Sequence, residues 1–358
     1  MKIVFVCNKY SPAHFYTIES YCYIFSQFKI DCFLLGDFLN SNEKYDLLNI
    51  DIISSKSLRK CKDKIVFFFV SPNTNNIKTV KLIEKSFPKA KTVYLYHEPM
   101  NKAVKKGLIK DRGFSFKTIK YIFGLSYFNG RPLLKHFDYV ILPSKNANTI
   151  FESDKSLKKK RHSIIHLLFK SNPQKKLGKK YSLSYIGTAA NNHGFAEFIQ
   201  FLLSKHYSNS DKVLIATSSK LDTKIIEQLN SKFGNNIEIH HGSFMSDGEI
   251  SQYYIQTKVL WLGYKHSAQS GVLPMSFMYG VPVVCSNIDA FSEFAEEGIN
   301  CEFININDCS SVSESIHRIW NSYEKYENGC LETYNKFFNP EFNKELVIET
   351  FNNICENN

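Results

Sequence analysis

The stretch from Tyr264 to Glu297, YKHSAQSGVLPMSFMYGVPVVCSNIDAFSEFAEE, decides the fold of this chain. Its pattern predicts a loop, then a helix that begins at Ser270-Gly271-Val272 and ends at Gly280, then a strand over residues 281–285. A glycine at the start of a helix lets a diphosphate approach the free backbone N–H groups, and the helix dipole favours negative charge there. Ligands of parallel sheets bind outside the carboxyl ends of the strands, where this loop falls. The stretch therefore predicts a phosphate-binding strand–loop–helix unit.

Apolar strands alternate with amphipathic helices through both halves of the chain. Continuous apolar runs such as KIVFFFV at residues 64–70 are typical of strands that are covered on both faces of a parallel sheet. Strands are predicted at residues 2–7, 30–35, 64–70, 92–96, 139–143, 183–186, 212–216, 237–240, 258–262 and 281–285, and helices at 17–28, 77–85, 146–152, 195–205 and 225–233. We therefore expect an α/β protein in which crossover helices join parallel strands.

The length of 358 residues suits two domains of roughly 150 residues each. The polar segment KSNPQKKLGKK, residues 170–180, contains Pro and Gly and is typical of a linker. We predict an N-terminal domain over residues 1–170, a C-terminal domain over 171–338, and a final helix within 339–358 that packs back on the body of the protein.

The two halves of the chain carry opposite net charge. Residues 1–180 hold 34 Lys and Arg against 13 Asp and Glu, a net charge of +21, whereas residues 181–358 hold 11 against 21, a net charge of −10. An A/T-rich genome enriches proteins in lysine, but this bias would not make the second half of the chain acidic. The asymmetry favours an anionic partner for the first half, either nucleic acid or a membrane surface.

The segment of residues 98–137 is too long for an ordinary connection and combines lysines with aromatic residues. Its apolar stripe at helical spacing consists of Phe116, Ile119, Phe123 and Tyr127, flanked by Lys117 and Lys120. A basic amphipathic helix of this kind predicts contact with an anionic membrane surface. A helix that packs its stripe on its own domain accounts for the pattern equally well.

Other classes of protein leave signals that this sequence lacks. The nine cysteines include no CxxC pair, which indicates reduced thiols in a cytoplasmic protein rather than a zinc site or a disulfide framework. The apolar run at residues 3–7 is too short for a secretory signal. No DxD or other dense ligand motif occurs, so we expect neither a metal nor another cofactor.

The quoted stretch resembles the donor-site core of GT-B glycosyltransferases, especially a large retaining family of bacterial polysaccharide enzymes. The resemblance rests on Gln269-Ser270-Gly271-Val272-Leu273-Pro274 followed by Gly280 and Pro282, and on Glu293 with the EEGIN run at residues 296–300. It implies two facing Rossmann-like domains with a cleft between them, a nucleotide-sugar donor in the C-terminal domain, and transfer with retention to a saccharide or polyprenyl-linked acceptor. It also implies a role in surface polysaccharide synthesis.

The chain departs from that family at the charged positions. The family's Glu-x7-Glu pair is missing, and the basic residues that follow the first strand of its donor domain are replaced by Thr188 and His193. Backbone amides, Ser270 and either His193 or Lys265 are then left to meet the diphosphate. The expected donor-binding residues are Gly187, Thr188, His193, Phe244, Gln269, Ser270, Gly271, Val272 and Glu293.

Other candidate residues follow strand ends elsewhere. His97 comes just past a strand's carboxyl end, where family members place a histidine near the transferred sugar, although a lone histidine is often structural. Tyr10, His14 and Glu98 are candidates for acceptor contact. Phe244 resembles a residue of the loop that meets the donor base, and a core anchor is at least as good an interpretation.

Three alternatives stay open. A nucleic-acid-binding protein would use the basic half. Because the sequence contains no recognisable nucleic-acid-binding motif, we expect no nucleic-acid partner. A nucleotide-sugar epimerase of the same shape would need more carboxylates near the donor loop. A non-catalytic GT-B subunit would explain the missing glutamate pair. Location on the inner face of the plasma membrane is the expected alternative to a freely cytoplasmic protein.

Overall fold

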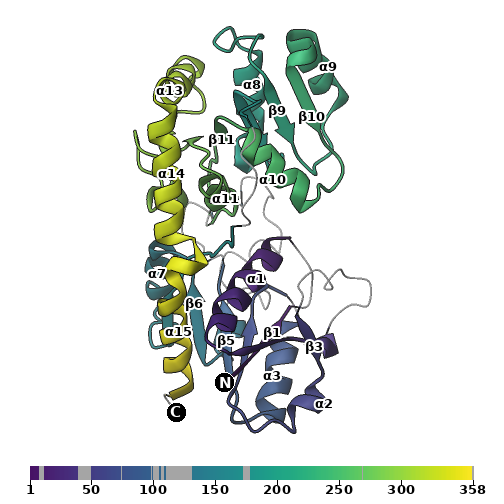
Figure 1. The fold of residues 1–358 in the computed structure, drawn as a ribbon, viewed down its shortest axis with the longest axis vertical. Coiled ribbons are helices and arrows are strands. Elements are labelled where there is room, and N and C mark those ends of the chain that lie inside the picture. Colours follow the sequence, from purple (N-terminus) through teal and green to yellow (C-terminus); the bar gives the residue numbers. More distant parts are fainter. Residues whose placement is uncertain are drawn as a thin grey trace. The chain divides into compact units, whose positions relative to one another are not determined.

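All the strand pairs that the structure describes are parallel, and they form two sheets. The structure, a computed structural model, describes residues 1–7, 12–38, 50–73, 75–97, 99, 105, 109, 131–171, 178–267 and 269–356. The chain divides into a first unit, residues 1–170 with 337–358, and a second unit, residues 171–336 (Figure 1). Two parallel α/β units confirm the predicted fold class.

The first unit contains a seven-stranded sheet in the order β3-β2-β1-β4-β5-β6-β7. Its strands are β1 (Lys2–Val6), β2 (Asp31–Leu35), β3 (Asp51–Ile53), β4 (Ile65–Phe69), β5 (Lys91–Leu95), β6 (Tyr139–Leu142) and β7 (His162–Ile164). The five residues of β4, IVFFF, are all buried, because helices cover both faces of the sheet.

Side chains of successive strand residues point to opposite faces, so each strand of this sheet supplies two cores. Ile3 and Phe5 of β1 pack in one core with α1 (Pro12–Gln27) and α15 (Pro340–Glu356). Val4 and Val6 pack in the other core with α3 (Asn76–Ser86), α6 (Arg131–Leu134) and α7 (Lys145–Glu152). The helices of the first unit are α1 (Pro12–Gln27), α2 (Ser55–Leu58), α3 (Asn76–Ser86), α6 (Arg131–Leu134), α7 (Lys145–Glu152) and α15 (Pro340–Glu356), with the 3-10 turn η1 (Gly36–Phe38).

The terminal helix α15 belongs to the core of the first unit (Figure 1). Its Phe351 lies edge-on to Phe25 of α1 with ring centroids 5.0 Å apart, and 5.4 Å from Phe68 of β4. Full burial of one such ring contributes about 1.5–3 kcal/mol. The predicted final helix therefore packs on the N-terminal part of the chain.

The second unit contains a six-stranded sheet in the order β10-β9-β8-β11-β12-β13. Its strands are β8 (Leu183–Ile186), β9 (Val213–Ala216), β10 (Ile237–His240), β11 (Leu260–Leu262), β12 (Val283–Cys285) and β13 (Cys301–Phe303). Its helices are α8 (Phe195–Leu203), α9 (Thr223–Phe233), α10 (Asp247–Gln256), α11 (Val272–Met278), α12 (Asp289–Ser292), α13 (Cys309–Asn321) and α14 (Tyr323–Phe337), with the 3-10 turns η3 (Asn191–His193) and η4 (Gly234–Asn236).

Local chemistry sets where these helices begin. The hydroxyl of Ser246 accepts from the N–H of Glu249, whose carboxylate accepts from the N–H of Ser246, and this reciprocal pair caps α10. Ser144 caps α7 by accepting from the N–H of Ala147 at 3.0 Å.

Several elements differ from the sequence-based predictions. Helix α1 begins at Pro12 rather than at residue 17, since proline suits the first helical position, so the backbone of His14 lies in the helix and not in the preceding loop. The three-residue strands β3, β7 and β13 were not predicted. The stripe of the 98–137 segment lies outside the described residues.

Candidate functional site

The strand order of the second sheet creates a switch point between β8 and β11. The chain leaves β8 toward one side of the sheet and β11 toward the other, and a crevice opens at the carboxyl ends of two such strands. Gly187 directly follows β8 and Gly263 directly follows β11. Most of the predicted donor-binding residues lie in the loops that start at these two glycines.

The two loops are packed against each other at Gly194 and Gly263. A Cβ atom on Gly194, which has φ +68°, would lie 1.9 Å from the carbonyl oxygen of Gly263. The N–H of Lys265 donates to the carbonyl of Asn192 at 2.9 Å. Only a residue without a side chain fits between these loops, so their spacing is fixed by backbone contact.

Gly187 and Val272, two of the predicted donor-binding residues, lie close together. Gly187 has φ +138°, and a Cβ there would lie 3.7 Å from Cγ2 of Val272. Its N–H donates to the carbonyl of Ala216 at 3.0 Å. The start of α11 thus lies beside the carboxyl end of β8.

Ser270 and Gly271 immediately precede α11. Ser270 is 9% exposed, and its hydroxyl accepts from the N–H of Leu273 at 3.4 Å. Gly271 is exposed and occupies the N-cap position with φ −79° and ψ −19°. Because that conformation suits any L-residue, the backbone itself does not require glycine at 271.

His193 stacks on Tyr264, with ring centroids 4.3 Å apart and ring planes 6° apart. Its Nδ1 donates to the carbonyl of Thr188 at 3.0 Å, which leaves Nε2 of the neutral ring unprotonated. Burial lowers the pKa of His193 from its ordinary value, against the opposing effect of that hydrogen bond. Burial also raises the pKa of Tyr264 to about 12, so both rings are uncharged at neutral pH.

Lys265 has an acidic partner and does not present an isolated charge. Its ammonium lies 2.8 Å from a carboxylate oxygen of Glu197 and donates to Oδ1 of Asn191 at 2.7 Å. The carboxylate of Glu197 is itself largely buried, and a half-buried pair of this kind is costly to break. The interpretation of Lys265 as a counter-ion for a diphosphate therefore loses support.

The ends of β9 and β10 extend the same edge of the sheet. Thr217 and Ser219 both accept from the N–H of Ala189 at 3.2 Å, which ties the β8 loop to the end of β9. Gly242 follows β10 with φ +75°, and Phe244 beyond it is 89% exposed. The interpretation of Phe244 as a core anchor is therefore wrong.

The remaining donor candidates lie at the margins of these loops. Thr188 is exposed, and its carbonyl also accepts from the Tyr185 hydroxyl at 2.7 Å. Gln269 is half-buried, and its backbone carbonyl accepts from the Ser267 hydroxyl at 2.5 Å. Glu293 is half-buried at the C-terminal end of α12.

In the first unit, His97 follows β5 and reaches the neighbouring strand. Its Nε2 donates to the carbonyl of Val70, just past β4, at 3.0 Å. His14 lies in the first turn of α1 by its backbone. Tyr10 and Glu98 lie outside the described residues.

Comparison with known proteins gives a clear likeness in structure alone. No protein-family model and no curated protein matches the sequence. A glycosyltransferase from Rickettsia africae is 12% identical, with a TM-score of 0.70 over 100% of this chain and 99% of its own. Anabaena HepE, solved with UDP and glucose, is 12% identical, with a TM-score of 0.68 over 98% and 99% of the two chains. Sucrose-phosphate synthase from Thermosynechococcus elongatus is 10% identical, with a TM-score of 0.66 over 99% of each chain.

The chain has the GT-B fold. The GT-B likeness covers both units, because each of these three matches spans nearly the whole chain.

Sequence reasoning missed several residues at the switch point of this GT-B chain. Tyr264, Asn191, Thr217 and Ser219 all make contacts there, yet none was singled out. The signal that could have found Tyr264 and Thr217 is their position within two residues of a predicted strand end. The contact partners of Asn191 and Ser219 are set by folding and leave no local pattern.

Neither a metal cluster nor a membrane span is present in the described part of the chain. Those residues contain no group of three or more His, Cys, Asp or Glu side chains that could hold an ion. None of the helices found among them is both long enough and apolar enough to cross a bilayer.

Proposed function

We propose that this protein is a glycosyltransferase that takes its sugar from a nucleotide-sugar donor held at the strand ends of the second unit. The observation that carries the proposal is the convergence of Gly187, His193 and the start of α11 at the β8–β11 switch point of a GT-B chain. Support also comes from Anabaena HepE, of similar fold, which has been solved with UDP-glucose.

In this proposal the donor diphosphate lies on the backbone amides of Ser270, Gly271 and Val272. With His193 neutral and Lys265 paired to Glu197, hydrogen-bond donors rather than full positive charges meet the phosphates. Preorganised amides stabilise charge that develops on a leaving group, because they need no reorganisation during the reaction. Thr188, Gln269 and Glu293 complete the contacts to the donor.

We place the nucleotide base beside Phe244, whose exposed ring offers a face for stacking. The preceding Gly242 has a positive φ, which turns the chain after β10 and carries the next residues outward. The donor base would then lie over the carboxyl ends of β9 and β10.

The first unit would bind the acceptor, with His97 as the residue closest to the chemistry. Its hydrogen bond to Val70 fixes the ring and its tautomer, so that it orients a hydroxyl of donor or acceptor rather than serving as an obligatory base. The family resemblance supports transfer with retention of configuration. His14, Tyr10 and Glu98 are the proposed acceptor contacts.

The acceptor we favour is a saccharide or a polyprenyl-linked saccharide of bacterial surface polysaccharide synthesis. The net charge of +21 over residues 1–180 would hold the first unit near the anionic inner leaflet, where such an acceptor resides. The net charge of −10 over residues 181–358 would leave the second unit free to exchange donor.

The test is a screen of nucleotide sugars for slow donor hydrolysis by the purified protein, run with and without EDTA. We expect one donor to be hydrolysed, equally well in EDTA. A parallel thermal-shift series with UDP, GDP, CMP and TDP should raise the unfolding temperature with the matching nucleotide. If no nucleotide stabilises the protein and no donor is consumed, the proposal fails.

A non-catalytic GT-B subunit is the second candidate, because Lys265, the lysine of the loop that follows β11, is paired with Glu197. Binding of a nucleotide without turnover, for any sugar or acceptor offered, would favour that candidate over the enzyme.

A further inference from the structure

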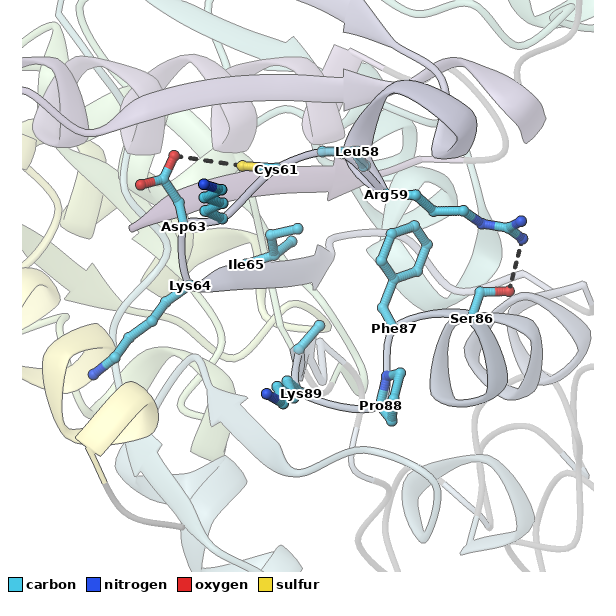
Figure 2. Close-up of a pocket in the computed structure, with 12 residues that line it drawn as sticks. Leu58, Arg59, Cys61, Asp63, Lys64, Ile65, Ser86, Phe87, Pro88 and Lys89 are labelled. Carbon is cyan, nitrogen blue, oxygen red and sulfur yellow. Dashed lines mark hydrogen bonds between the residues drawn. The ribbon is translucent and has the colours of Figure 1, made fainter.

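A cavity of about 500 Å³ opens at the amino end of the first sheet (Figure 2). One wall is the segment of residues 58–65, which leads into β4, and the other is the turn of residues 86–90, which leads into β5. In the sequence, the proposed acceptor residues come after the carboxyl ends of β1 and β5. The five residues of β4 separate the amino ends of the strands from their carboxyl ends by roughly 13 Å, at about 3.3 Å per residue.

Four cationic side chains line this cavity, namely Arg59, Lys62, Lys64 and Lys89. Within the part of the chain that the structure describes, no acidic side chain forms an ion pair with any of them. The one acid of the lining, Asp63, is 3.7 Å from the ammonium of Lys2. Unpaired like charges around one cavity repel each other, and an anionic ligand would relieve that repulsion.

The walls between these charges are apolar. Leu58, Ile65 and Phe87 contribute to the lining, and the ring of Phe87 points from the 86–90 turn toward the opposite wall (Figure 2). In that view Arg59 extends toward Ser86 on one side, while Lys64 and Lys89 extend to the other (Figure 2). A ligand that fills the cavity would therefore cover the Phe87 ring and carry its negative charge at the rim.

The cavity is larger than a bare inorganic anion. Ligand cavities of about 300–1,000 Å³ usually hold small organic molecules and combine apolar walls with a few charged groups. Guanidinium and ammonium groups are the usual partners of phosphate oxygens.

We propose that this cavity binds a phosphate ester that carries an apolar group, with the phosphate at the cationic rim and the apolar group against Phe87. Both a soluble organic phosphate and a phospholipid headgroup have this chemistry. The site is separate from the proposed donor and acceptor sites, and its existence does not depend on them.

The first arm of the test measures binding of phenyl phosphate and of inorganic phosphate to the full chain by calorimetry. We expect phenyl phosphate to bind at least tenfold more tightly than inorganic phosphate, and more weakly as salt rises. The double variant Arg59→Gln/Lys89→Gln should lose at least tenfold in affinity. The control Lys78→Gln removes an exposed charge of α3 outside the cavity and should bind phenyl phosphate as the wild type does.

The second arm sediments the protein with vesicles of phosphatidylglycerol or of phosphatidylcholine. Binding to phosphatidylglycerol that the double variant loses and Lys78→Gln keeps would identify a lipid headgroup as the source. Phenyl phosphate binding without vesicle binding would identify a soluble phosphate ester. The proposal is overturned if neither probe binds, if the double variant binds both as the wild type does, or if inorganic phosphate binds as tightly as phenyl phosphate.

Discussion

The backbones of Gly194 and Gly263 touch, so that a Cβ on Gly194 would lie 1.9 Å from the Gly263 carbonyl oxygen. Gly194→Ala should therefore lower the free energy of unfolding by more than the roughly 1–2 kcal/mol that left-handed backbone costs a residue with a side chain. Gly298→Ala is the matched control, because Gly298 has φ +76° and open space around its Cβ position. Equal losses in urea unfolding of the two variants would contradict the contact.

Replacement of Gly271 by Val should weaken binding of the nucleotide diphosphate by tenfold or more, because a branched side chain would block the amides before α11. The fold should tolerate the change, since Gly271 has φ −79° and ψ −19°. Calorimetry measures the affinity, and urea unfolding serves as the control. Unchanged affinity in a folded variant would remove the donor site from this loop.

Phe244→Ala should leave the free energy of unfolding within about 0.5 kcal/mol of the wild-type value, because the ring is 89% exposed. Loss of stacking on a base costs about 1–3 kcal/mol, so nucleotide affinity should fall roughly fivefold to 150-fold. Phe342→Ala, at a 69% exposed position of α15, is the control and should leave affinity unchanged. Similar nucleotide affinities of the wild type, Phe244→Ala and Phe342→Ala would refute the contact between Phe244 and the base.

His193 should destabilise the protein in acid. Its pKa is lowered by burial, so the unfolded state takes up a proton more readily below the ordinary value of 6.5. The contribution of His193 to stability is thus complete above about pH 6.5 and is lost as pH falls toward its lowered pKa. Unfolding of His193→Gln should depend less on pH between 7 and 5 than unfolding of the wild type. An identical pH dependence would show that His193 titrates normally.

His97→Ala should lower turnover by about a hundredfold, the cost of a misplaced reacting group, and stability only by the ~1 kcal/mol of one hydrogen bond. His97→Gln, which can still donate to the Val70 carbonyl, separates the two effects. If His97→Gln restores both stability and turnover, the histidine is structural. If it restores stability alone, the imidazole acts in the reaction.

Long apolar strands and the helices between them could be predicted from the sequence. A strand that is buried on both faces of its sheet needs an uninterrupted run of apolar residues, and such a run is visible in the sequence. Ile65–Phe69 is the clearest case, five apolar residues that are all buried. The strand Asp51–Ile53 has only three residues, too few for any periodicity, and exists through its pairing with β2. Such short strands form because neighbouring strands pair with them, and the local sequence does not reveal that pairing.

The candidate site was predictable in position but not in electrostatics. The strand-end rule, which depends only on where strands stop, and the family resemblance together assigned Gly187, His193 and Gly271 to the loops after β8 and β11. The ion pair of Lys265 involves Glu197, which is distant in the sequence and reaches it only after folding. The exposure of Phe244 likewise depends on the turn at Gly242, against the usual burial of aromatic side chains.

The packing of α15 on α1 has a consequence for synthesis of the protein on the ribosome. The core of the first unit includes Val347, Phe351 and Ile354, which are translated after the whole of the second unit. Domains generally fold as units while the chain grows from its N-terminus. Here the second unit, continuous from residue 171 to 336, has its complete core before the first does. The nascent first unit therefore exposes the apolar surface that α15 covers, including Phe25 and Phe68, until the last helix emerges.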